Sequence, residues 1–210
     1  MATALQLVNR ALLKLGEPVL TALTGTGAMV TRVAALFPSV LRAFMVEDDW
    51  YWARKRAVLA EDEDNEDVSL FDHAYDLPAD CLYPRYLYAT NGVQPTYHIE
   101  GLKLYSDAEP DDDSPVLVYT GDPLDELTLV AGNLIPAWWE DAFAAVLAAE
   151  LAFPTSRDAE LSQRLRGEAL FLTVARAKQL NAMAEPGYGD AEEDWGGSTV
   201  DTGRRHPKRT

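Results

Sequence analysis

The sequence predicts an α+β protein with helices in its N- and C-terminal parts and a small antiparallel β-domain inserted between them. Apolar residues recur at helical spacing before residue 50 and again after residue 136. Between these regions, short alternating apolar and polar runs are separated by turn residues, which is typical of antiparallel strands. We therefore expect helices over 1–50 and 136–183, a β-rich region with acidic loops over 51–135, and an extended tail over 184–210.

The first region contains two helical patterns. Thr3 and Gln6 have the spacing of a capping box, and Gly16 is typical of a helix end, so the first helix is expected between them. The second pattern runs from about residue 28 to 49 and contains Pro38. Because proline removes a backbone hydrogen bond and clashes with the preceding turn, we expect a kink at Pro38 or two shorter helices that meet there.

The segment Phe71–Tyr88 is expected to connect the helical first part to the β-domain. A Leu-Pro-Ala-Asp sequence in its middle predicts a turn, because proline pushes the residue before it out of the helical region. The part after this turn, Cys81–Tyr88, is rich in Tyr and Leu and predicts a strand. Tyr97–Tyr105 alternates around a central glycine and predicts a hairpin, and Val116–Thr120 predicts a further strand.

Helical patterns return after residue 136. The alanine-rich stretch from Pro136 to Pro154 would let another helix approach closely. The last helix, expected from Asp158 to about Met183, has an apolar stripe too wide for a single neighbour. One of these two faces is therefore expected to pack on a second subunit. The candidates for this interface are Ala148, Ala149, Leu161 and Phe171.

The net charge of −16 is concentrated in the middle of the chain. Residues 57–156 contain 21 acidic groups against two basic ones, whereas the first 56 residues are slightly basic and the last 54 are neutral overall. Such a surface repels phosphates, which argues against a helical DNA-binding regulator. The acidic runs 61–67 and 107–114 predict solvated loops, because burying many unpaired carboxylates is costly. The basic triplet 54–56 is either a nucleic-acid patch or a solvated turn paired with carboxylates, and we favour the second interpretation.

No catalytic or metal-binding constellation is recognisable. Histidines 73, 98 and 206 lack metal-ligand spacing, and the Asp run 111–113 lacks the other ligands of a calcium loop. The carboxylates at 140, 141 and 150 could suggest a metal site, but no Glu-x-x-His accompanies them, and an exposed helix face is the better interpretation. We expect no cofactor and no enzymatic activity, a carboxylate-based hydrolase being the weaker alternative.

The cysteine content and the hydropathy of the chain indicate where the protein is made. Cys81 is the single cysteine, so no internal disulfide is possible, and we expect it to be a small buried strand residue. No apolar run reaches the length of a membrane span, and the N-terminus lacks a signal sequence. A soluble protein that is made inside a cell, without a membrane partner, is therefore expected.

Five pieces of the chain resemble, in order, the tail tubular protein A family, the head-to-tail adaptors of short-tailed bacteriophages. Together they cover roughly residues 3–183, and the piece at Ala74–Leu82 is the most specific. The pieces are LGEPV at Leu15–Val19, Trp50 with Ala53, Lys55–Arg56 and Leu59, AYDLPADCL at Ala74–Leu82, Tyr97–Asp107, and AAELA at Ala148–Ala152.

The resemblance implies that the N- and C-terminal helices form one helical bundle with the β-domain inserted between them. It also implies a ring, expected to hold twelve subunits, that docks beneath a portal protein and above a tail tube or nozzle. DNA would pass through its centre, and the protein would belong to the virion neck after assembly in the host cytoplasm. The family has no catalytic residues to carry over, and another neck protein, such as a stopper or tail-completion protein, is the alternative. The chain departs from the family in Pro38 and in its long acidic loops. Acidic residues expected to face the channel or tail are Glu61, Asp62, Glu63, Asp64, Asp111, Asp112 and Asp113.

The tail is polar and glycine-rich, so it cannot bury enough apolar surface to fold by itself. It nevertheless contains Trp195 and four basic residues within its last seven. Aromatic and Arg residues are frequent anchors of protein interfaces, so we expect the tail to bind the portal. The alternative is an unstructured end without a role. The portal-binding candidates are Trp195, Arg204, Arg205, Lys208 and Arg209.

Overall fold

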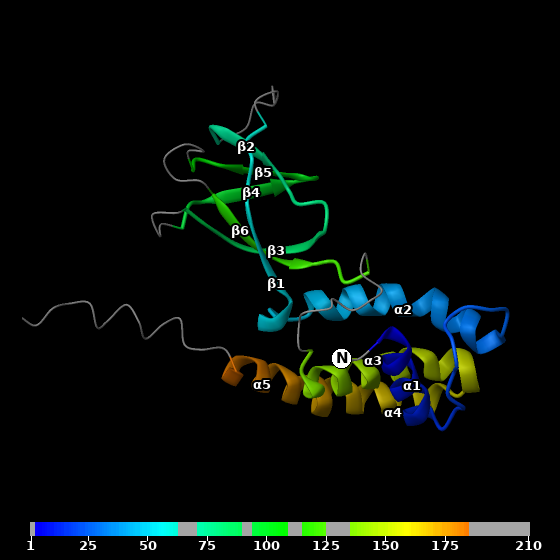
Figure 1. Cartoon of the computed structure of the whole chain (residues 1–210). Coiled ribbons are helices and arrows are strands. Elements are labelled where there is room, and N and C mark those ends of the chain that lie inside the picture. The colour runs from blue at the N-terminus through cyan, green and yellow to red at the C-terminus, as the bar shows by residue number, and fades with distance from the viewer. Residues whose placement is uncertain (1–2, 63–70, 90–93, 109–114, 125–134, 185–210) are drawn as a thin grey trace, which may run out of the picture.

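The computed structural model describes residues 3–62, 71–89, 94–108, 115–124 and 135–184, and it confirms the α+β class. The helices lie together in the lower half of Figure 1, and two small antiparallel sheets lie above them. The helical segments are α1 (Ala4–Leu15), α2 (Ala28–Val46), the 3₁₀ turn η1 (Tyr51–Ala53), α3 (Ala137–Ser156), α4 (Ala159–Glu168), the π-helix η2 (Ala169–Val174) and α5 (Ala175–Ala184).

The two N-terminal helices follow the sequence signals closely. Both hydrogen bonds of the capping box between Thr3 and Gln6 are present, and Gly16 ends α1 in the left-handed conformation. Helix α2 is continuous through Pro38, so the prediction of two shorter helices is wrong. It also ends at Val46, a few residues earlier than expected, because the chain turns there into η1.

The C-terminal helices form an antiparallel hairpin. Its first arm is α3, and its second arm is the continuous helical run of α4, η2 and α5. Pro136 is the N-cap of α3, and the helix continues through Pro154 to Ser156, so the prediction that Pro154 ends it is wrong by two residues. Arg157 ends α3 in the left-handed conformation. The Asp158 carboxylate then caps α4, as expected, by accepting two backbone hydrogen bonds.

The helical core is dominated by aromatic side chains. Trp50, Trp139 and Phe143 are fully buried, and Trp139 stacks on Phe143 with 5.4 Å between ring centroids. Phe44 of α2 contacts all three rings at centroid distances of 5.3 to 5.8 Å. Aromatic pairs of this kind contribute roughly 0.5–1.5 kcal/mol beyond the area they bury, so this cluster holds α2, α3 and the residues before η1 together.

The β-domain consists of two three-stranded antiparallel sheets, with strand orders β1-β6-β3 and β2-β5-β4. Side chains from both sheets share one core, in which Tyr75, Leu87, Leu104 and Leu117 are fully or almost fully buried. The predicted hairpin is confirmed, with Gly101 at its turn in the left-handed conformation. The strands are β1 (Arg54–Val58), β2 (His73–Asp76), β3 (Cys81–Tyr88), β4 (Tyr97–Glu100), β5 (Lys103–Ser106) and β6 (Val116–Gly121).

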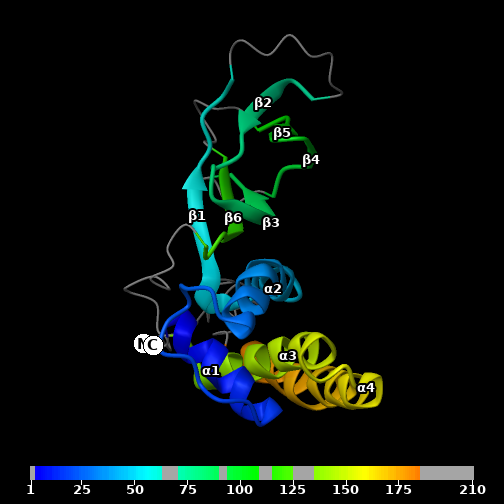
Figure 2. The same ribbon diagram turned by 90° about the vertical axis from the view of Figure 1, so that its right-hand side faces the viewer.

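The connection between helices and sheets differs from the prediction. Phe71–Tyr88 joins one sheet to the other, since β2 and β3 belong to different sheets, and the expected turn lies between them with a 2.8 Å hydrogen bond from Cys81 N–H to Pro78 C=O. The chain leaves the helices through η1 and β1 instead, and β1 rises from the end of α2 (Figure 2). The β-rich region therefore begins with β1, directly after η1, and the role predicted for Phe71–Tyr88 is wrong.

Candidate functional site

Three consecutive apolar side chains are exposed on the π-helix η2. Leu170 is 47% exposed, Phe171 81% and Leu172 65%. Successive helical side chains point in different directions, so these three cover a wide arc of the helix, with Leu170 and Leu172 lining different hollows and Phe171 between them. Large apolar side chains exposed next to one another often mark an interaction site. We call this surface, Leu170–Leu172, the η2 patch.

The π-helix explains why the patch exists. A π-helix makes its backbone hydrogen bonds from residue i to i+5, so it widens the helix and turns successive side chains by smaller steps. The Thr173 hydroxyl donates a 2.8 Å hydrogen bond to the carbonyl of Ala169 at the start of this turn. Such a side-chain bond satisfies a carbonyl that helical distortion leaves weakly bonded. The widened turn spreads Leu170, Phe171 and Leu172 over a broad surface.

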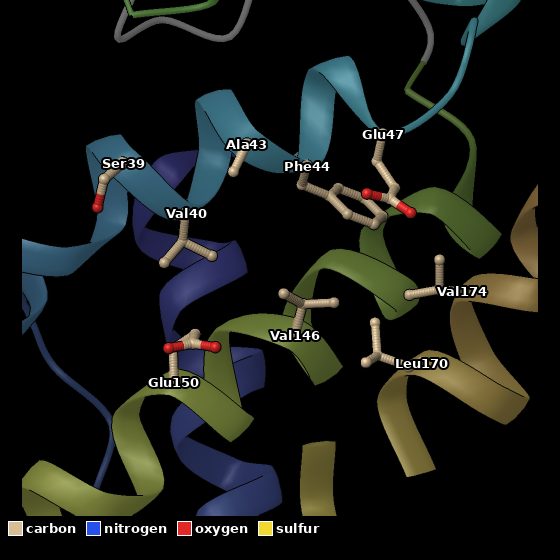
Figure 3. A pocket seen from close by; sticks show the side chains of 9 residues that line it. All are labelled: Ser39, Val40, Ala43, Phe44, Glu47, Val146, Glu150, Leu170 and Val174. Atoms are coloured by element: carbon tan, nitrogen blue, oxygen red, sulfur yellow. The ribbon is translucent and has the colours of Figure 1, made fainter. Parts of the chain in front are cut away.

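An apolar groove of about 330 Å³ lies beside the patch, between α2, α3 and η2 (Figure 3). The buried side chains of Val40, Phe44 and Val174 form its floor, and Leu170 forms one rim. Figure 3 shows the side chains of the three elements pointing toward the space between them. The complete lining consists of Ser39, Val40, Ala43, Phe44, Glu47, Val146, Glu150, Leu170 and Val174.

Ion pairs join the walls of the groove. Arg166 of α4 contacts Glu150 of α3 at 2.7 Å, and Lys178 of α5 contacts Glu47 at the end of α2 at 2.8 Å. All four side chains are at least 36% exposed, so each pair contributes at most about 1 kcal/mol. One pair therefore links α4 to α3, and the other links α5 to the end of α2. The groove lies between these two contacts, beside η2.

The structure divides the predicted subunit-interface residues into two classes. Ala148 and Ala149 are 1% and 2% exposed in the single chain, so they pack inside the protomer and a second subunit cannot contact them. For these two residues the prediction is wrong, because the small side chains serve the close approach of α3 to its own neighbours. Leu161 is partly buried, whereas Phe171 is the most exposed residue of the η2 patch.

Two of the predicted acidic residues lie in the described part of the chain, where they are paired. The carboxylate of Glu61 lies 2.6 Å from His73 Nδ1, and Asp62 forms an ion pair with Lys103. Hydrogen bonds that the Lys103 ammonium donates to Asp62 and Asp76 raise the pKa of Lys103, although burial opposes this. The remaining acidic candidates, Glu63, Asp64, Asp111, Asp112 and Asp113, lie outside the described residues, as do Trp195, Arg204, Arg205, Lys208 and Arg209.

The basic triplet 54–56 lies on β1 rather than in a turn, and its pairing with carboxylates is confirmed for two members. Arg54 contacts Asp49 at 2.8 Å, and Lys55 contacts Asp80 at 2.7 Å. Asp80 also accepts a 3.0 Å hydrogen bond from the Tyr119 hydroxyl. Burial opposes ionisation of Asp80, but the hydrogen bonds from Lys55 and Tyr119 outweigh it and lower its pKa.

Two groups beside this carboxylate hold their protons more tightly than usual. Burial, followed by the negative charge of Asp80, raises the pKa of the Cys81 thiol to about 11. Burial and the hydrogen bond to Asp80 likewise raise the pKa of Tyr119. Cys81 is half-buried on β3, so the thiol stays protonated near neutral pH and is a poor nucleophile.

The joint between the helices and the β-domain contains two residues that the sequence analysis missed. Arg85 of β3 donates hydrogen bonds to the backbone carbonyls of Met45 and Asp48 at the end of α2, and its side chain is only 11% exposed. From the opposite side, Asn181 of α5 donates to the carbonyl of Asp49 at 2.8 Å and accepts from Tyr51 N–H at 3.1 Å. Arg85 could have been noticed as one of only two basic residues among 21 acidic ones in residues 57–156.

The described residues form no metal site, and one of their helices is apolar along its length. Within the described ranges, no three His, Cys, Asp or Glu side chains lie close enough together to hold a metal ion. Helix α2 is long and apolar enough to cross a membrane by length and composition, contrary to the expectation that no such run exists. Its side chains Phe37, Leu41 and Phe44 are buried in the helical core, as in the core helix of a folded domain.

Comparison of the chain with protein-family models and with curated proteins gives no significant match.

Proposed function

We propose that this protein is a structural virion component, a head-to-tail adaptor that assembles as a ring between a portal protein and a tail tube or nozzle. DNA would pass through the ring without specific binding. Two observations support the proposal: the ordered sequence resemblance over residues 3–183 and the exposed η2 patch. In this proposal the helical part of the chain is the bundle that the adaptor family builds from both chain ends.

The η2 patch is the observation that carries the proposal. Removing a Phe side chain from water contributes roughly 2–3 kcal/mol, and a ring repeats the gain at every contact between subunits. Leu170 and Leu172 lie on either side of Phe171 around the helix and would extend such a contact in both directions. A ring interface centred on Phe171 explains why the chain retains three exposed apolar residues in a row.

A closed ring also constrains where the complementary surface lies. Neighbouring subunits in a ring of twelve are rotated by only about 30°, so the two contacting surfaces must face nearly opposite directions on one protomer. Helix α1 and η2 both pack against α3. On α1, Leu13 is 64% exposed, and Val19 in the following loop is 53% exposed. We propose that this second surface, Leu13 and Val19, receives the η2 patch of the next subunit.

The test is the mass of the purified protein, alone and mixed with the portal protein of the same virus. Phe171→Asp and Leu13→Asp are each expected to abolish the ring while the monomer stays folded, because both side chains are mostly exposed. Leu102→Asp is the matched control, since Leu102 is 80% exposed in the β4–β5 turn, far from both surfaces in the chain. A ring that survives both changes would place the interface elsewhere. A ring of other stoichiometry without portal binding would favour a stopper or tail-completion protein.

A further inference from the structure

We propose that the groove between α2, α3 and η2 binds the indole ring of Trp195 from the C-terminal segment of the same chain. The inference goes beyond the adaptor function, since it concerns the single subunit before assembly. It rests on two observations: the apolar chemistry of the groove and the length of chain between Ala184 and Trp195.

The groove suits a large apolar side chain. Its floor of Val40, Phe44 and Val174 offers no hydrogen-bond partner to water, and Val146 and Leu170 extend the apolar surface at the rim. Polar lining groups stand at the margins, where Ser39, Glu47 and Glu150 lie (Figure 3). An indole ring presents a large apolar body and one polar N–H, which matches an apolar floor with a polar rim.

The η2 patch of a second copy does not fit the groove in the proposed ring. Leu170 lines the groove, and Phe171, the next residue, projects roughly 90° away from it around the helix, so the groove and Phe171 do not lie on opposite sides of the protomer. Two copies could exchange Phe171 side chains only across a two-fold axis. A ring of many subunits needs surfaces on opposite sides of the protomer, so it leaves the groove free for another occupant.

Chain length allows Trp195 to reach the groove of its own subunit. Trp195 is eleven residues beyond Ala184, and an extended segment of that length spans up to about 36 Å. The path back along α5 from Ala184 to Val174 covers ten residues, or roughly 15 Å of helix. A short tether of this kind gives an effective concentration in the millimolar range, so even modest affinity suffices for docking within one chain.

The experiment follows Trp195 directly by ¹⁹F NMR on the full chain labelled with 5-fluorotryptophan, at concentrations where mass measurement shows single subunits. Trp195→Phe assigns the signal, and a peptide of residues 185–210 gives the undocked position. The Trp195 signal is expected to be displaced from the peptide position. Ala43→Glu, which introduces a carboxylate into the exposed lining of the groove, should return it to that position, whereas Ala159→Glu on the exposed start of α4 should not.

Three results would overturn the proposal. A Trp195 signal at the peptide position in the full chain would show that the groove is empty or is filled by another element, such as residues 125–134 or Phe171 of a second copy. A displaced signal that Ala43→Glu leaves unchanged would place the indole elsewhere. A displacement that disappears on hundredfold dilution would assign Trp195 to the groove of a neighbouring copy. None of these results depends on whether the protein is an adaptor.

Discussion

At the scale of single residues, Arg85 connects the β-domain to the helices. Its guanidinium donates to two carbonyls at the end of α2 and to the Thr120 hydroxyl at 2.9 Å, and it lies 4.7 Å from the centre of the Tyr83 ring. The carbonyls at a helix end have no partner within the helix, so a cation placed there satisfies them and interacts favourably with the helix dipole. Removing it leaves these groups unpaired at a partly buried joint.

Arg85→Met should therefore destabilise the protein. Hydrogen bonds to charged groups contribute about 1.5–3 kcal/mol, and we expect a loss of roughly 2–3 kcal/mol in the free energy of unfolding measured with urea. The matched control is Arg56→Met on β1, an exposed arginine whose replacement should cost less than about 0.5 kcal/mol. Equal losses for the two variants would mean that η1 and Asn181 hold the joint without Arg85.

Residue types predicted some local roles and not others. Thr3, Gln6, Gly16 and Asp158 act through bonds to residues at most four positions away, so their spacing was enough to predict the helix ends. Arg85 and Asn181 bind backbone groups 37 to 132 positions away, and nothing in the local sequence marks such partners. For the same reason the pairing of Lys55 with Asp80 could be anticipated as a type of contact but not as a specific pair.

At the scale of elements, α3 is the central helix of the helical part. It contacts α1, α2, α4 and η2, and its alanines are buried on several sides. The sequence showed that these alanines allow close approach but not which helix approaches. The assignment of Ala148 and Ala149 to a subunit interface failed because a helix surrounded by its own chain has the same composition as one shared between subunits.

Ala148→Arg is now expected to impair folding itself. Arginine cannot reach solvent from a site that is 1% exposed without displacing α3 from its neighbours, so the loss should exceed about 3 kcal/mol. Thermal unfolding followed by circular dichroism measures the effect. Ala175→Arg, on an exposed position of α5, should leave the melting temperature within a few degrees of the parent protein. A folded Ala148→Arg monomer that fails only in ring assembly would restore the original interface assignment.

The strands were predicted more accurately than the connection between the two parts of the chain. Cys81–Tyr88, the hairpin around Gly101 and the strand at residue 116 follow from alternation and turn residues alone. Strand order within each sheet and the shared core of the two sheets depend on pairings between distant segments. The π-helix η2 was not predicted either, because its residues continue an ordinary helical pattern and the widened turn is visible only in the backbone.

At the scale of the whole molecule, the chain separates two kinds of surface. The helical part carries the η2 patch and the groove, whereas residues 57–135, before α3, contain 18 acidic groups against two basic ones. In the proposed ring, apolar contacts between helices would hold subunits together, and the acidic residues would discourage DNA from adhering as it passes. Glu61 and Asp62 are already paired with His73 and Lys103, so the unpaired charge must come from other acidic residues.

Portal binding by the tail and docking of Trp195 in the groove exclude each other, because one indole ring cannot occupy both sites at once. Docking in the groove would therefore lower the apparent affinity for the portal by the fraction of undocked tail. Ala43→Glu, which blocks the groove, should strengthen portal binding, by about tenfold if nine tenths of the tails are docked. Trp195→Ala and deletion after Met183 should both weaken it.

The measurement is the dissociation constant between the monomeric adaptor and the assembled portal at fixed salt. Ala159→Glu provides the matched control and should leave the constant unchanged. Neutralising Arg204, Arg205, Lys208 and Arg209 should weaken binding most at low salt, because exposed charge contacts are screened. If Ala43→Glu weakens portal binding as much as Trp195→Ala does, the groove itself contacts the portal, and competition between the two sites is excluded. If the truncated chain binds at full strength, the tail has no part in docking, and the portal must recognise the folded part of the subunit.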